Sequence, residues 1–167
     1  MKAKLDSDCV VAALELVSSK KVIDKSLYQK ISAGNWERLP EIELKHFETG
    51  VLFPCCDSKH WWMILAKDGK LYGFNSMKKW NKLMKQSMEL IQKYMESLTG
   101  MEMEMILVQC PEQSDSVSCA WHVIKYAIAL EDEKEQQSIL SSKKIFFENE
   151  EIELVKKTIN EAINKGV

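Results

Sequence analysis

The sequence predicts an α+β fold, in which a small mixed central sheet carries an antiparallel hairpin and is flanked by helices. Two β-prone runs, 61–66 and 70–74, flank Lys67-Asp68-Gly69, and Asp-Gly is a strong signal for a tight hairpin turn. Apolar residues recur at helical spacing over 79–98 and 119–130. No repeat or Pro/Gly/Ser linker divides the 167 residues, so we expect a single domain over 1–167.

The segment before the hairpin is expected to contain helices and one strand. Asp6 or Ser7 can cap a first helix, whose apolar face consists of Val10, Ala13, Leu14 and Val17. Short helical segments are expected at 26–32 and 40–48, the second beginning at Pro40 and ending before Gly50. The apolar run 51–53 then predicts a short strand that ends at Pro54.

The segment after the hairpin is expected to alternate between helix and strand. The helix over 79–98 is stopped by Gly100, and its expected inward side chains are Trp80, Leu83, Met84, Ile91, Tyr94, Met95 and Leu98. Methionine and glutamate alternate over 101–105 as in a half-buried strand, which continues into 106–108. The helix over 119–130 is followed by a charged segment at 131–135 and by a last helix near 149–165.

Composition excludes several classes of protein. A net charge of −2, from 23 basic and 25 acidic residues, argues against a dedicated nucleic-acid-binding domain. No apolar run approaches the roughly 20 residues that cross a bilayer, and the chain does not start with a signal-peptide core, so we expect a soluble protein. Five cysteines, an odd number, predict free thiols in a reducing compartment, cytoplasmic or nuclear. Cys55 and Cys56 are adjacent and lack zinc-ligand spacing, so no metal site is expected.

Cys119 is the candidate nucleophile, because it should open a helix whose unpaired first-turn amides stabilise a thiolate. Ser116 or Ser118 can cap that helix. The alternative is a buried structural cysteine, the commoner fate of a free thiol.

His60 is the candidate base, because it lies at a loop-to-strand boundary where rigid scaffolds present catalytic groups. The alternative is an ordinary surface histidine. His122 should point along its own helix, and His46 lies among charged residues. The hairpin should bring Asn75 beside His60, where the amide oxygen can orient the imidazole, and it should leave Asp68 at the far turn.

Gln113 is the candidate oxyanion donor. It lies six residues before Cys119, so its amide can donate to a developing oxyanion beside the Cys119 backbone N–H. Taken alone, a glutamine in a polar loop is usually just solvated.

Together, His60-Trp61, Asn75-Ser76 and the Gln113-to-Cys119 spacing resemble the Ulp1/SENP cysteine proteases, isopeptidases that process SUMO, NEDD8 and, in some relatives, ubiquitin. The resemblance spans roughly residues 4–130. It implies a papain-like, Ulp1-like fold in which Cys119 is the nucleophile, His60 the base and then acid, and Gln113 the oxyanion donor. Asn75 would replace the usual acidic third member, and Trp61 would cover the Gly-Gly tail of the modifier.

Three departures from the family pattern stand out. Ser118-Cys119-Ala120 replaces the family's Asp-Cys-Gly, and the third catalytic member is neutral. In the family, an aromatic residue forms one wall of the tunnel that holds the Gly-Gly tail, and Lys4 stands at that position here. Trp36 is the candidate to form this wall instead. The implied partner is a ubiquitin-like protein with its conjugates, bound by a monomer without cofactor, nucleic acid or membrane.

Two other functions fit this resemblance. The departures suit a degenerate relative that binds a ubiquitin-like protein without cutting it. Some bacterial effectors use a similar His/acid/Cys set for acetyl transfer, but the scattered basic residues here form no obvious coenzyme A or inositol-phosphate site.

Overall fold

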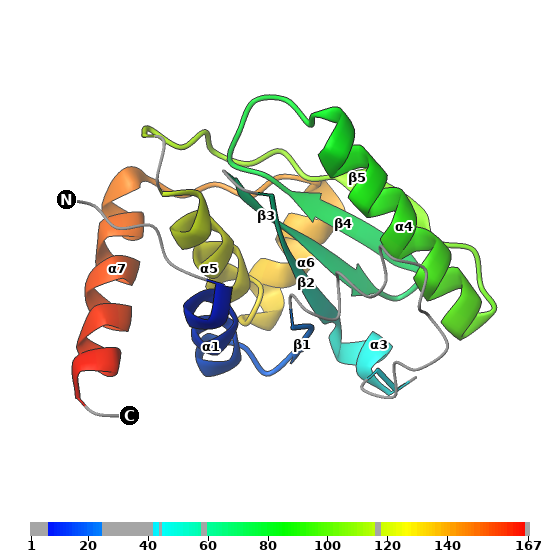
Figure 1. Ribbon diagram of the computed structural model, residues 1–167, viewed down its shortest axis with the longest axis horizontal. Helices are drawn as coiled ribbons and strands as arrows, with labels where there is room; N and C mark the ends of the chain where they lie inside the picture. Colours follow the sequence, from blue (N-terminus) through cyan, green and yellow to red (C-terminus); the bar gives the residue numbers. More distant parts are fainter. Residues whose placement is uncertain (1–6, 25–41, 44, 58–59, 116–117, 166–167) are drawn as a thin grey trace.

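The computed structural model describes residues 7–24, 42–43, 45–57, 60–115 and 118–165 (Figure 1). The helix expected at 26–32 lies outside the described residues, as do Lys4, Trp36 and Ser116. None of the helices in these ranges combines the length and apolar character that crossing a membrane requires.

Five strands form one mixed sheet within the described residues. They are β1 (Lys21–Val22), β2 (Val51–Cys56), β3 (Trp61–Lys67), β4 (Lys70–Phe74) and β5 (Glu104–Leu107), and they lie side by side in that order. The central pairs β2–β3 and β3–β4 are antiparallel, whereas β1 and β5 run parallel to their neighbours at the two edges. The expected mixed sheet around an antiparallel hairpin is confirmed.

The hairpin turn has the conformation that its sequence predicts. Lys67 pairs with Lys70, so Asp68 and Gly69 form a two-residue turn. Both turn residues have positive φ, 49° and 78°, as the twist of a tight hairpin requires.

β2 runs through Pro54, where the sequence predicts that it ends. β1 pairs with Val51 and Leu52. Among the described residues, β2 has a strand on one side only beyond Leu52, and such an edge position tolerates a residue without a backbone N–H.

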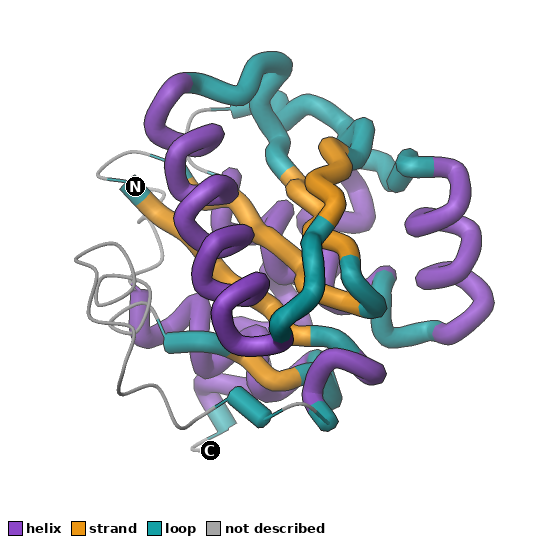
Figure 2. Tube along the Cα trace, turned by 90° about the vertical axis from the view of Figure 1, so that its right-hand side faces the viewer, coloured by secondary structure: helices purple, strands orange, loops and turns teal. Residues whose placement is uncertain are grey.

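Helices cover both faces of the sheet (Figure 1). On one face lie α1 (Ser7–Val17), α5 (Cys119–Ala129), α6 (Glu133–Ser142) and α7 (Asn149–Asn164). The other face packs against α3 (His46–Thr49) and α4 (Lys82–Thr99), and Figure 2 shows α4 lying across the strands. Successive β3 side chains alternate between the two cores, with Trp61 and Met63 facing α5 and Trp62 and Ile64 facing α4.

α4 begins three residues later than predicted, because the Asn81 side chain accepts a hydrogen bond from the Met84 amide and caps the helix there. Gly100 ends it in the left-handed conformation, as expected. Leu83 and Leu98, predicted to point inward, are 48% and 37% exposed, because the buried stripe instead follows Met84, Met88, Ile91 and Met95.

Three further elements differ from the sequence analysis. The charged segment at 131–135 leads into α6, which begins where the Asp132 carboxylate accepts from the Glu135 amide at 2.9 Å. Among the described residues of 40–48, only those of α3 are helical, and α3 ends before Gly50. Of the methionines expected to alternate inward over 101–105, only Met103 is buried, because β5 begins at Glu104.

Candidate active site

Cys119 is the first residue of α5, and its side chain is only 2% exposed. Ser118 holds the capping position, but its hydroxyl makes no capping hydrogen bond; Ser116, the other predicted cap, lies outside the described residues. The Asp115 carboxylate instead accepts from the Ser118 amide at 2.7 Å and so closes the loop that leads into the helix. Cys119 therefore lies at a positive helix end whose entry is fixed by Asp115.

His60 and Asn75 lie together as the hairpin predicts. Nε2 of His60 lies 2.6 Å from Oδ1 of Asn75. The Asn75 amide can point only one way, because its Nδ2 donates to the carbonyls of Met77 and Lys79, both at 3.2 Å, and its Oδ1 also accepts from the Met77 amide. His60 Nε2 must then be the donor, so in the neutral ring Nδ1 is the nitrogen left without a proton.

The backbone and ring of His60 are also held in place. The backbone amide donates to the Asp57 carboxylate at 2.7 Å, and the Asp57 amide donates to the His60 carbonyl at 3.1 Å. Trp62 stacks beside the imidazole, with ring centroids 6.2 Å apart. Sequence reasoning missed Asp57, although its place three residues before His60 is a recognisable turn signal.

Burial sets the protonation of His60, whose side chain is 6% exposed. Desolvation lowers the pKa of His60, and the Asn75 hydrogen bond and the Asp57 charge offset only part of this effect. The ring is therefore neutral near pH 7 and can accept a proton at Nδ1.

Gln113 is anchored rather than simply solvated. Its backbone amide donates to the Ser76 carbonyl at 2.9 Å, and the Ser76 hydroxyl donates to Gln113 Oε1. Its Nε2 donates to the Asp115 carbonyl at 2.6 Å. Asn75 and Ser76 are consecutive, so one short segment after β4 contacts both His60 and Gln113.

The remaining predicted site residue and the other two histidines lie in different surroundings. Trp61 is 7% exposed and belongs to the core cluster that includes Cys119. His122 is 1% exposed and packs against the rings of Tyr126 and Phe147. Nδ1 of His46 accepts from the Glu43 amide.

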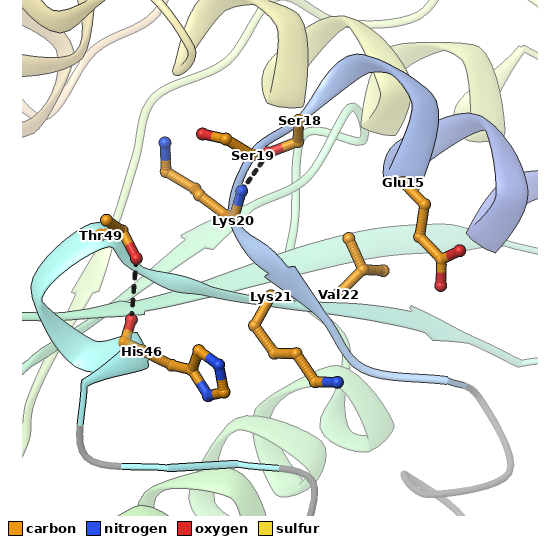
Figure 3. Close-up of a pocket in the computed structure, with 8 residues that line it drawn as sticks. All are labelled: Glu15, Ser18, Ser19, Lys20, Lys21, Val22, His46 and Thr49. Carbon is orange, nitrogen blue, oxygen red and sulfur yellow. Dashed lines mark hydrogen bonds between the residues drawn. The ribbon is translucent and has the colours of Figure 1, made fainter.

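A surface cavity of about 300 Å³ lies between α1, β1 and α3 (Figure 3). It is lined by Glu15, Ser18, Ser19, Lys20, Lys21, Val22, His46 and Thr49. None of the predicted catalytic residues lines it. The described residues include no group of three or more His, Cys, Asp or Glu side chains placed to hold a metal ion.

The fold is that of Ulp1-like cysteine proteases, as comparison with solved structures shows. The chain superposes on the SUMO protease Ulp1, in a form with its catalytic cysteine oxidised to a sulfonic acid, with a TM-score of 0.70 and 11% identity over 95% of this chain and 76% of that one. The Xanthomonas campestris effector XopD bound to ubiquitin gives a TM-score of 0.67 at 12% identity, covering 96% and 93%.

A third match is the C-terminal Ulp1 protease domain in complex with SMT3, the yeast ortholog of SUMO. Its TM-score is 0.57 at 13% identity, over 75% of this chain and 64% of that one. No family profile matches the sequence, and no curated protein sequence matches it. The predicted fold class is therefore confirmed by structure at an identity too low for sequence matching.

Proposed function

We propose that this chain is a cysteine protease that cleaves after the C-terminal Gly-Gly of a ubiquitin-like protein. The observation that carries the proposal is the His60–Asn75 hydrogen bond, which leaves His60 Nδ1 as the proton acceptor. Cys119 at the start of α5 is the nucleophile, and Gln113 is the oxyanion donor. The Ulp1-like fold supports the same reading.

The reaction proceeds in two stages. His60 Nδ1 takes the Cys119 thiol proton, and the thiolate attacks the carbonyl carbon of the terminal glycine. The oxyanion accepts from the Cys119 backbone N–H and from the second Nε2 hydrogen of Gln113, the one that does not bond the Asp115 carbonyl. His60 then protonates the departing amine, leaving a thioester. In the second stage His60 deprotonates a water that attacks the thioester, which releases the modifier and restores the thiol.

Asn75 performs the orienting task without a charge. Its oxygen fixes the imidazole tautomer, which is the role that a carboxylate fills in the related triads. A neutral partner suffices for this task, because an amide oxygen accepts the Nε2–H of His60 as a carboxylate oxygen does.

The proposed substrate is a ubiquitin-like protein, because structures with this fold include complexes with SMT3 and with ubiquitin. A diglycine tail is thin enough to enter a channel that excludes side chains. We propose that Trp61 contacts this tail beside His60, together with Trp36, which lies outside the described residues.

Mass labelling tests the nucleophile and the substrate together. The chain is incubated with ubiquitin, SUMO and NEDD8 probes that carry thiol-reactive C-termini, and intact mass is measured. We expect one adduct, abolished in Cys119→Ala and retained in Cys9→Ala, a matched control in a half-buried cysteine on α1. Folded protein that labels with none of the probes would contradict the proposal.

Cleavage kinetics test the oxyanion donor. Gln113→Ala should lower kcat by about 10²–10³, as the loss of one preorganised donor does. A loss below about tenfold would place the oxyanion hole elsewhere.

One observation favours a second function, binding of a ubiquitin-like protein without cleavage. Ser118-Cys119-Ala120 replaces the Asp-Cys-Gly of the family pattern, so the acidic residue before the nucleophile is lost. Measurable binding of ubiquitin, SUMO or NEDD8 by a chain whose Cys119 stays unlabelled would select this function.

A further inference from the structure

The Gln113 side chain is fixed at both ends of its amide. Oε1 accepts from the Ser76 hydroxyl, and Nε2 donates to the Asp115 carbonyl at 2.6 Å. These two contacts assign the amide orientation, because Nε2 has no lone pair with which to accept and a carbonyl cannot donate.

Both contacts can persist during the proposed reaction. The Asp115 contact uses one of the two Nε2 hydrogens, which leaves the other hydrogen for the oxyanion. The Ser76 contact uses Oε1, which the oxyanion does not need. A hydroxyl that donates to an amide oxygen also polarises the amide and strengthens its N–H as a donor.

Ser76 is itself a rigid support. It is 2% exposed, and its backbone carbonyl accepts from the Gln113 amide at 2.9 Å, so it contacts Gln113 through both main chain and side chain. The preceding residue, Asn75, is tied to the turn at Met77 and Lys79. The Ser76 hydroxyl is therefore held where the loop before α5 must meet it.

We propose that Ser76 is a positioning residue for the oxyanion hole, orienting and polarising the Gln113 amide while Asn75 orients His60. This role rests on the proposed function. It makes the Asn75-Ser76 segment the shared support of the base and of the oxyanion donor, which come from distant parts of the chain.

Kinetics of single and double variants test this role. The substrates are fluorogenic C-terminal amides of ubiquitin, SUMO and NEDD8. Ser76→Ala should lower kcat by about tenfold, the effect of one buried hydrogen bond, with KM unchanged. In the Gln113→Ala background the same change should cost less than about twofold, because Ser76 acts through Gln113.

Two readouts separate positioning from general damage. Alkylation of Cys119 by iodoacetamide forms no oxyanion, so its rate should be the same in Ser76→Ala as in the wild type. The acid limb of the pH–rate profile, which reports His60, should also be unchanged. Thr99→Ala removes a partly buried hydroxyl that donates to the Met95 carbonyl at the end of α4, and it should leave kcat within about twofold of the wild type.

Each outcome decides between the claims. Wild-type kcat in Ser76→Ala, a full tenfold loss in the Gln113→Ala background, or a slower alkylation would overturn the role of Ser76 alone. A wild-type chain that cleaves none of the three substrates would overturn the proposed function and this role with it. Ser76→Cys keeps the side-chain size but weakens the donor, so it gives the same comparison if Ser76→Ala does not fold.

Discussion

His122 should make the folded chain sensitive to acid. Its ring is 1% exposed, packs against Tyr126 and Phe147, and has a buried Nδ1 without a hydrogen-bond partner among the described residues. Burial, aided by the nearby charges of Lys156 and His60 and opposed by Asp115, lowers the pKa of His122 to about 4.

The size of the effect follows from proton linkage. The pKa of an unfolded histidine is 6.5, so below that pH His122 is protonated in the unfolded chain. In the folded chain it stays neutral until about pH 4. The contribution of neutral His122 to the free energy of unfolding is therefore complete above pH 6.5, and it is lost as the pH falls from 6.5 toward 4. These two pKa values give a loss of about 2 kcal/mol between pH 8 and pH 5, approaching about 3 kcal/mol below pH 4.

Urea unfolding at pH 8 and pH 5 measures this loss, with His122→Leu as the comparison. Burial also lowers the pKa of His60, so both proteins should lose some stability in acid. The wild type should lose about 2 kcal/mol more than the variant. Equal losses in the two proteins would show that His122 is already protonated, or solvated, in the folded chain.

Three further substitutions test the site and the fold. Asn75→Asp should keep or raise the cleavage rate, because a carboxylate also accepts from His60 Nε2; a collapse of activity would count against the orienting role. Asp132→Ala removes the cap on Glu135 and should cost about 1 kcal/mol in urea unfolding, whereas no loss would mean that α6 does not depend on this cap. Gly73→Ala would place its Cβ 2.6 Å from the Trp80 ring, so we expect the free energy of unfolding to fall by about 1–3 kcal/mol; an unchanged free energy would show that Trp80 moves aside freely.

Local chemistry explains which parts of the fold could be predicted. The Asp68-Gly69 turn determines the hairpin register by itself, because few residues adopt positive φ at both turn positions. That register in turn brings Asn75 back beside His60. Gly100 likewise ends α4 through its own backbone conformation.

Where the predictions failed, distant contacts decide the outcome. Whether β2 continues through Pro54 depends on how far β1 extends beside it. A strand of two residues, such as β1, has no recognisable pattern in the sequence. The exposure of Leu83 and Leu98 depends on which face of α4 packs against the sheet. Two overlapping sets of apolar residues on α4 both have helical spacing, so the sequence does not distinguish between these faces.

The sequence alone therefore determined the fold class, the hairpin and the four candidate residues His60, Asn75, Gln113 and Cys119, because turn chemistry, helix periodicity and motif spacing are local properties. Only the tertiary structure decided how those residues are held. The Ser76 hydroxyl reaches Gln113 across 37 positions of sequence, and the Asp115 carboxylate accepts from the Ser118 amide at the entry to α5. The Ser76 contact depends on how the segment after β4 packs against the loop before α5. Packing between distant segments produces no periodic pattern in the sequence, so it cannot be predicted from local residue spacing.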